Sequence, residues 1–169
     1  VNGGTTFIKI IPSAENRVEI KYQSDIKDHG FAVTAKNGEL KISTDREIHF
    51  HTECFEVTVY ANCDSVSING GIELIMDGVS TTSLEIDVQG AVKAQIADAH
   101  ADSMSIKVDG AGEFDINGDV DTFSAEFNGA GELRAKELIC KDASISISGA
   151  GEAEISCSGT LSTDISGVG

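Results

Sequence analysis

The sequence predicts an all-β fold, a right-handed single-stranded parallel β-helix with coils of about 20 residues and an irregular β N-terminal part. A short motif with a lead glycine recurs at nearly constant spacing, and apolar and polar residues alternate on both sides of it. The alternation has a period of two, and β-branched residues dominate the apolar positions. A helical fold is excluded because glycine would recur inside any helix that could be drawn.

The repeat occupies residues 64–169, where the motif reads Asn-Gly-Gly-Ile-Glu from Asn69 and Asn-Gly-Ala-Gly-Glu from Asn128. The lead glycines of its six copies are Gly70, Gly90, Gly110, Gly129, Gly149 and Gly167. They are 20, 20, 19, 20 and 18 residues apart, a period that indicates a solenoid. Glycine suits a sharp corner between two strands because it adopts positive φ at no steric cost. The right-handed preference of parallel crossovers favours a right-handed coil.

Each coil supplies two strands, and the alternation predicts which residues point inward. In one central coil these residues are Met104, Ile106, Val108, Phe114 and Ile116. The same positions in the last copy include Leu161 and Ile165. Parallel strands stack about 4.8 Å apart, so equivalent residues of successive coils are expected to form aliphatic ladders.

Residues 1–63 are also predicted to be β, but without glycine corners. Apolar or alternating runs predict strands at 7–11, 18–22, 31–33, 40–42, 48–50 and 55–59. Asn37-Gly38 is a typical two-residue hairpin turn. We expect this part to pack on the first coil and cover its unpaired strand edge. Residues 1–169 are therefore predicted to form a single domain, with 1–63 as irregular capping coils or hairpins and 64–169 as regular coils.

The Gly-Ala-Gly-Glu corners follow Ser-x-Ser or Glu-x-Asn strands, and an N-terminal run ends in Val57-Thr58-Val59. In these features the chain resembles the head GIN domain family of putative auto-transporter adhesins over nearly its whole length, although the second corner reads Gly90-Ala91-Val92-Lys93. The resemblance implies a right-handed parallel β-helix in the periplasm or at the cell surface of a bacterium. It carries no catalytic residues, and we expect any signal or anchor segment to lie outside this chain.

The charge of the chain limits its partners. Its 12 Lys and Arg residues face 28 Asp and Glu residues, a net charge of −16, of which residues 64–169 carry −14. Nucleic acid and anionic membranes require clustered basic residues, so neither is an expected partner. Apolar runs are shorter than the roughly 18 residues that cross a bilayer, so direct membrane insertion is not expected either. Cations, basic proteins and neutral ligands remain.

Three glutamates form a candidate cation site. Glu113, Glu132 and Glu152 each lie three residues after a lead glycine, so they should stack in one outer column. Like charges about 5 Å apart repel by about 1 kcal/mol even in water. The column is therefore either a solvated face of splayed side chains or a site for a cation such as calcium, which prefers carboxylate oxygens. Lys93 stands between Glu73 and Glu113 in the same column, which predicts an ion-pair ladder there.

The histidines and cysteines leave further alternatives open. His49 and His51 share one strand face and could bind a transition metal with Glu47 or Glu53, or simply form a polar face. The four cysteines show no Cys-x-x-Cys spacing. Cys140 and Cys157 fall at nearly the same place on adjacent coils, and there a disulfide is possible at a turn but strained between flat strands.

Catalytic motifs are weak. The chain contains no Gly-x-Ser-x-Gly elbow, and its Gly-x-Gly corners do not open a helix, so they are not phosphate loops. Parallel β-helices often carry polysaccharide-active enzymes, but fold analogy alone is a weak argument. A carboxylate pair such as Glu113 and Asp115 means little among 28 acids, and the chain lacks Trp for stacking on sugars. We therefore predict that the protein is not an enzyme, with a polysaccharide-active enzyme as the alternative.

Two non-catalytic functions remain. In the first, the chain is an adhesin-like domain that binds a glycan or a surface protein through a flat polar face. The predicted face consists of Ser65, Ser105, Ser124, Ser144 and Ser162 with Asn69, Gln89, Asp109 and Asn128. In the second, the chain is a structural rod that associates through the strand edge at Gly167–Gly169.

Overall fold

The computed structural model of the chain describes residues 6–22, 31–36, 39–44 and 55–169. Within these ranges the structure is strands and their connections. The strands are β1 (Thr6–Ile11), β2 (Arg17–Tyr22), β3 (Phe31–Lys36), β4 (Glu39–Thr44), β5 (Phe55–Tyr60), β6 (Ser65–Asp77), β7 (Ser80–Cys157) and β8 (Leu161–Val168). The described part of the chain has no helix of the length and hydrophobicity that crossing a bilayer requires.

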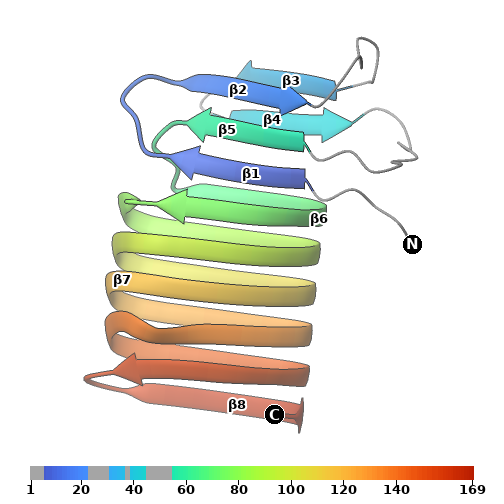
Figure 1. Cartoon of the computed structure of the whole chain (residues 1–169). Helices are drawn as coiled ribbons and strands as arrows, with labels where there is room; N and C mark the ends of the chain where they lie inside the picture. Colours follow the sequence, from blue (N-terminus) through green and yellow to red (C-terminus); the bar gives the residue numbers. More distant parts are fainter. Residues whose placement is uncertain (1–5, 23–30, 37–38, 45–54) are drawn as a thin grey trace.

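Strands β6, β7 and β8 form the predicted solenoid of about five turns, and its coils descend in a right-handed sense (Figure 1). β7 is continuous over 78 residues because the ribbon keeps its ladder hydrogen bonds around the corners. β6 pairs in parallel with the first part of β7, with Gly70 opposite Gly90. β8 pairs in parallel with the last part of β7, with Gly149 opposite Gly167. The predicted stacking of lead glycines is confirmed at these pairs.

The inward columns form one apolar core along the solenoid. Large and small side chains share the interior, so that Phe123 and Phe127, both buried, flank buried Ala125. Phe114 and Phe127, from opposite faces of the coil, meet edge to face with ring centroids 5.9 Å apart. The predicted inward positions of the central coils are buried.

The lead-glycine corner brings two backbones closer together than a side chain would permit. Gly129 has φ +139°, and a Cβ built on it would lie far inside van der Waals contact with the carbonyl oxygen of Gly110. Gly110 in turn lies against the carbonyl of Gly90 in the same way. Glycine is therefore required here twice, for its φ and for the close approach.

A second corner lies at the opposite edge of three successive coils and was not predicted from the sequence. It contains the positive-φ residues Gly78, Asp98 and Gly118. Asp98 is the one non-glycine residue with positive φ in the described ranges, at +52°, and its amide donates a 2.8 Å hydrogen bond to Asn117 Oδ1 on the next coil. This contact holds the left-handed conformation, which Asp tolerates better than most residues do.

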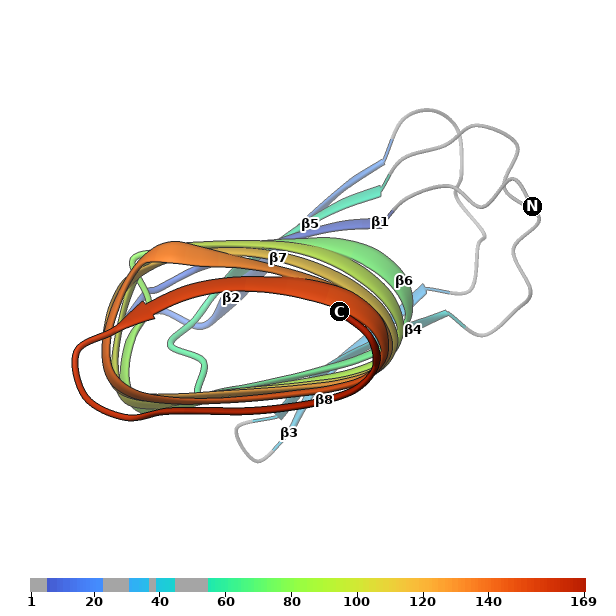
Figure 2. The same cartoon turned by 90° about the horizontal axis from the view of Figure 1, so that it is seen from below.

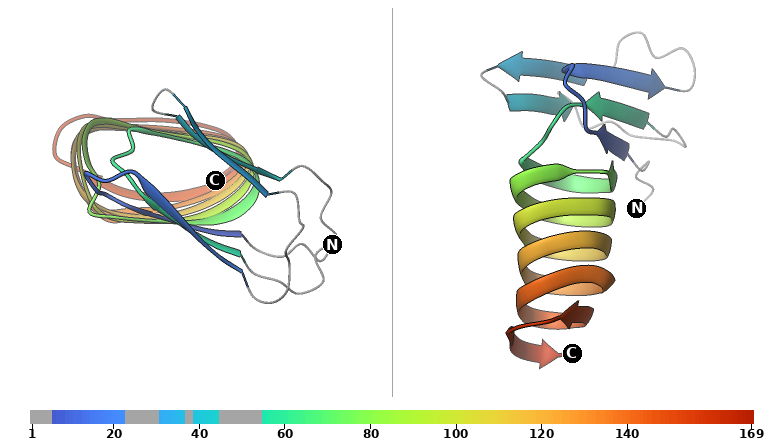
Figure 3. Two further views of the ribbon diagram at one scale, coloured as in Figure 1. Left: turned by 90° about the horizontal axis from the view of Figure 1, so that it is seen from above. Right: turned by 90° about the vertical axis from the view of Figure 1, so that its left-hand side faces the viewer.

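The N-terminal strands cover part of the first coil. β1 pairs in parallel with β6 on one side and with β5 on the other, and β2 joins β5 in antiparallel fashion. The β3–β4 hairpin is a separate two-stranded sheet that lies beyond the same end of the solenoid, on the side opposite β1, β2 and β5 (Figure 3). Its two strands pair out to Lys36 and Glu39, as predicted, whereas the turn residues 37–38 and the strand expected at 48–50 lie outside the described residues. That the whole chain is a single domain stays a prediction.

The last coil differs from the others. Leu161, Ile165 and Val168 of β8 are 49, 52 and 78 % exposed, although the first two occupy inward positions of the repeat. In the described structure β8 pairs on one side only, with β7. The prediction that these positions are buried is therefore wrong for this coil, because burial of an inward residue needs a coil on both sides.

The corner can be tested with two glycine substitutions, one at a stacked lead glycine and one at a glycine with free space around it. We expect Gly129→Ala to destabilise the protein by at least about 2 kcal/mol, because it adds backbone strain to a clash with a neighbouring carbonyl. Gly71→Ala is the matched control, since a Cβ there meets nothing within 4 Å and its φ is not positive. Denaturant unfolding measures both, and equal stability of the two variants would contradict the role of the corner.

Candidate functional site

The coil is a flattened oval, so the solenoid has two broad outer faces (Figure 2). One face carries the outward side chains of the strands that precede the lead glycines, and the other carries those that follow them. The first face is rich in Ser and Thr. The second face carries most of the cross-coil ion pairs.

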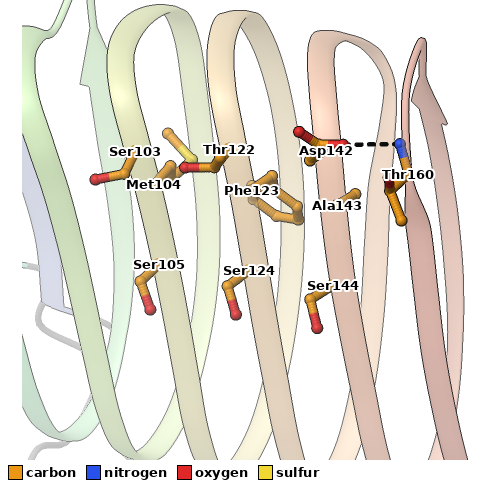
Figure 4. A pocket seen from close by; sticks show the side chains of 10 residues that line it. All are labelled: Ser103, Met104, Ser105, Thr122, Phe123, Ser124, Asp142, Ala143, Ser144 and Thr160. Carbon is orange, nitrogen blue, oxygen red and sulfur yellow. Dashed lines mark hydrogen bonds between the residues drawn. The ribbon is translucent and has the colours of Figure 1, made fainter.

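A shallow groove runs across several coils on the first face (Figure 4). We call it the hydroxyl groove. One wall consists of Ser103, Thr122, Asp142 and Thr160, and the other consists of Ser105, Ser124 and Ser144. The floor is the backbone of Met104, Phe123 and Ala143, whose side chains are buried in the core. The predicted serine column is thus continuous along the groove.

The two walls differ in their hydrogen bonds. On the first wall, Ser103 Oγ donates to Ser83 Oγ at 3.1 Å and Thr122 Oγ1 donates to the carbonyl of Asp102 at 3.1 Å. On the second wall, the hydroxyls of Ser105, Ser124 and Ser144 have no hydrogen-bond partner within the described ranges. These exposed hydroxyls are available to a ligand as both donors and acceptors.

Asp142 is the one carboxylate among the residues that line the groove. It accepts a 2.8 Å hydrogen bond from the Thr160 amide, and that bond lowers the pKa of Asp142. The carboxylate therefore stays ionised at neutral pH and holds the turn that leads into β8. It is placed for structure rather than for donating a proton.

A neighbouring polar column lies next to the lead glycines, as predicted for Asn69, Gln89, Asp109 and Asn128. Asn128 Nδ2 donates to Asp109 Oδ1 on the adjacent coil at 3.0 Å and to Glu126 Oε1 at 2.9 Å. This amide thus joins two carboxylates that would otherwise repel each other.

The second face holds a ladder of ion pairs across the coils. Lys93 Nζ lies 3.4 Å from Glu113 Oε1, which confirms the Lys93–Glu113 step of the predicted ladder. Arg134 Nη1 lies 2.7 Å from the same Glu113 oxygen, and its other nitrogen pairs with Glu132. Arg134 therefore bridges two of the three glutamates proposed as a cation site, a role the sequence reasoning missed.

The charge environment of Glu113 follows from these contacts. The hydrogen bond from the Arg134 guanidinium, helped by Lys93, lowers the pKa of Glu113. A lowered pKa means that the native state favours the ionised form, so this stabilisation is present above the ordinary Glu range. It is lost as the pH falls through the native pKa of Glu113.

The cation hypothesis for Glu113, Glu132 and Glu152 stays a prediction. Glu152 is exposed, and Arg134 already offsets the charge of the other two. In the described ranges, no group of three His, Cys, Asp or Glu residues is arranged to hold a metal ion. His49, His51, Glu47 and Glu53 lie outside those ranges, and so does Cys54. Cys63, Cys140 and Cys157 are free thiols in this structure.

The bridging role of Arg134 predicts a titration result. We expect Arg134→Gln to raise the pKa of Glu113 toward its ordinary value, because the variant removes the strongest of the interactions that lower it. Carbon-detected NMR of the Glu carboxylates against pH measures this. Lys136→Gln is the control, since Lys136 pairs with Glu154 at 2.8 Å instead. An unchanged Glu113 pKa in Arg134→Gln would overturn the assignment.

Comparison with known proteins finds the same fold in a solved structure. A search of solved structures finds a putative adhesin from Bacteroides fragilis with a TM-score of 0.75 and 17 % sequence identity. The match covers 99 % of this chain and 87 % of that chain, and at this identity it shows the shared fold. A search of curated proteins finds no match.

The family comparison extends over the whole sequence. The model of the family described as "putative auto-transporter adhesin, head GIN domain" matches residues 1–169. The Gly-Ala-Gly-Glu corners that carried the resemblance are corners of the solenoid, and Val57-Thr58-Val59 lies in β5. The chain therefore belongs to the head GIN domain family of putative auto-transporter adhesins.

Proposed function

We propose that the protein is a non-catalytic adhesin-like module that acts outside the cytoplasm, at the bacterial cell surface, and holds a neutral glycan along the hydroxyl groove. The observation that carries the proposal is the second wall of the groove. There Ser105, Ser124 and Ser144 present hydroxyls from three successive coils with no partner of their own in the described structure.

The spacing of the walls suits an extended polyhydroxyl chain. Coils repeat about every 4.8 Å, and residues two apart along a strand are separated by about 7 Å, so the hydroxyls form a regular flat grid. Hydroxyl groups both donate and accept, which lets them match a ligand that does the same at each repeat unit. A rigid sheet also loses little entropy when a ligand binds, which favours affinity.

Charge narrows the class of ligand. Among the residues that line the groove, Asp142 carries the only charge, and the whole chain carries −16. Acidic polysaccharides would therefore be repelled. A neutral glycan avoids both this repulsion and the cost of burying a charge without a partner.

The groove favours binding over hydrolysis. Glycosidases typically use two carboxylates that flank the scissile bond. Asp142 stands without a second carboxylate among the lining residues, and its lowered pKa makes it a poor proton donor. On the other face, Glu113 and Glu132 are held by Arg134. A polysaccharide-active enzyme stays the alternative, which release of reducing sugar on incubation would support.

Glycan binding can be tested by filling the groove. The double variant Ser105→Val/Ser124→Val removes two exposed hydroxyls while keeping residues that favour strands. We expect it to lose about tenfold or more in affinity for neutral polysaccharides selected on a glycan array, because each hydrogen bond contributes about 1 kcal/mol. Isothermal titration calorimetry with the parent and the variant measures the change.

A control on the other face separates loss of binding from loss of fold. Gln95 and Ser156 are exposed there, so Gln95→Val/Ser156→Val should bind like the parent. Equal glycan binding by the groove variant and the parent would show that the hydroxyl groove is not the binding site. Binding of a surface protein, with no binding of any glycan, would show that the ligand is a protein and not a glycan.

A second function, end-to-end association into a rod, is favoured by β8. Leu161 and Ile165 are half exposed on a strand that pairs on one side only in the described structure. Such an edge can accept a strand from a second copy. The large net charge opposes this association, and salt should therefore promote it.

Sedimentation velocity tests the rod. We expect the parent to form dimers at high concentration in about 0.5 M salt, where the Debye length is only a few ångströms. Leu161→Lys/Ile165→Lys should stay monomeric. Ile139→Lys is the control, because Ile139 is 68 % exposed but belongs to β7 and not to the edge strand β8. A monomeric parent under these conditions would count against the rod.

A further inference from the structure

We propose that Cys140 and Cys157 form a cross-linking site, in which an intramolecular disulfide fastens the end of β7 to the coil above it. The structure holds both as free thiols. The proposal rests on their register, their burial and the change in backbone path beside them.

The hydrogen-bond ladder makes the two cysteines direct neighbours. The Ser158 amide donates to the carbonyl of Cys140 at 2.9 Å, and the Gly159 amide donates to the carbonyl of Lys141 at 2.7 Å. In a parallel ladder, when the carbonyl of one residue accepts a hydrogen bond from an amide on the next strand, that residue lies opposite the residue just before the donor. Cys140 therefore lies opposite Cys157.

The spacing fits a disulfide. Neighbouring parallel strands are about 4.8 Å apart, and disulfides join Cα atoms about 4.4 to 6.8 Å apart. Flat strands tend to hold the Cβ atoms slightly too far apart. Here the sequence separation between paired residues of neighbouring coils changes. Cys140 lies opposite a residue 17 positions further on, whereas Ala143 pairs with Leu161, 18 positions further on. Cys157 is also the last residue of β7, next to the bend at Ser158, so the backbone can adjust.

Both side chains face the interior. Cys140 is 3 % exposed, and Cys157 is partly buried and packs against the core. Cys140 Sγ donates to the carbonyl of Ser156, the residue before its partner, at 3.1 Å. Burial raises the pKa of the Cys140 thiol, so it is a poor first nucleophile. Cys157, the more accessible of the two, is placed to react first.

The reaction needs a disulfide oxidant, such as oxidised glutathione or a thiol oxidoreductase. The Cys157 thiolate attacks the oxidant disulfide, forming a mixed disulfide and releasing one thiol. Cys140 then loses its proton and attacks the Cys157 sulfur, and the second half of the oxidant leaves as a thiol. Two protein thiols become one disulfide, and the oxidant disulfide becomes two thiols.

The cross-link would close a ring of one coil. It joins residues at the two ends of the segment 140–157, which contains a complete turn including the corner at Gly149. This turn leads into β8, whose apolar side chains are exposed. A covalent ring would prevent the end of the solenoid from unwinding, which is useful in an oxidising compartment outside the cytoplasm.

Peptide mapping tests the site. In the variant Cys54→Ser/Cys63→Ser only the proposed pair remains. We would refold it in a glutathione redox buffer, block free thiols and digest with trypsin. Cys140 then lies in the peptide 137–141 and Cys157 in the peptide 142–169, because Lys141 separates them and no Lys or Arg follows. We expect the two peptides to be linked, with a monomer mass 2 Da below that of the reduced protein.

Stability provides an independent measurement. Oxidation of this variant should raise its melting midpoint by about 6 to 12 °C, as expected for a disulfide that closes a loop of this size. Cys140→Ser, added to the same variant, should show no link and no difference between oxidising and reducing buffer. If both thiols are blocked and unlinked after refolding, the proposed disulfide is overturned. If the two peptides are linked but the melting midpoint does not rise, the proposal that the disulfide fastens the end of β7 is overturned.

Discussion

The close contact between stacked lead glycines is the constraint on which the rest of the structure depends. Each coil turns where its lead glycine lies against the carbonyl of the lead glycine above, as Gly129 does against Gly110. A Cβ at this point would push the two coils apart or move one along the other. A shift of one residue would turn every outward side chain inward, because side chains alternate along a strand. The corner therefore fixes the register, and the register decides which residues meet.

Both broad faces are consequences of that register. The hydroxyl groove exists because Ser105, Ser124 and Ser144 occupy one position in three coils whose lengths differ by a residue. The ion-pair ladder exists because Lys93 and Arg134 are carried next to Glu113 from different coils. The groove on one face is thus lined mainly by hydroxyls, with Asp142 as its one charged residue, while several carboxylates of the other face pair with Lys93, Arg134 and Lys136. This division leaves the first face as the better surface for an uncharged ligand.

Much of the fold could be predicted from the sequence because the repeat states the same information several times. The lead glycines gave the coil length, the alternation gave the core, and the shared column gave the Lys93–Glu113 pair. The second corner was not predicted because Asp98 stands where the adjacent coils have Gly78 and Gly118, so no glycine repeat marks the position. The conformation of Asp98 also depends on a hydrogen bond to Asn117 of another coil. The bridging role of Arg134 was not predicted because Arg134 lies in a different outward column from the glutamates, two residues after Glu132. Residues two apart on a strand point to the same face, so its side chain still reaches Glu113 and Glu132.

The N-terminal strands were harder to arrange. Their existence followed from apolar runs, but no repeat dictates which strand meets the first coil. The structure places β1 there, between β5 and β6, so the chain's first strand is inside the sheet. Exposure of Leu161 and Ile165 likewise could not be read from their own positions, since it depends on what stacks beneath them.

The most direct test of the central claim is the register of the coils in solution. NOEs between backbone protons report which residues face each other across a parallel ladder. The structure predicts contacts from Ser105 to Glu85 and its neighbours on one side and to Ser124 and its neighbours on the other, with matching contacts between Gly110 and Gly129. Contacts displaced by one residue, or an antiparallel pattern, would contradict the glycine-stacked solenoid and the hydroxyl groove that depends on it.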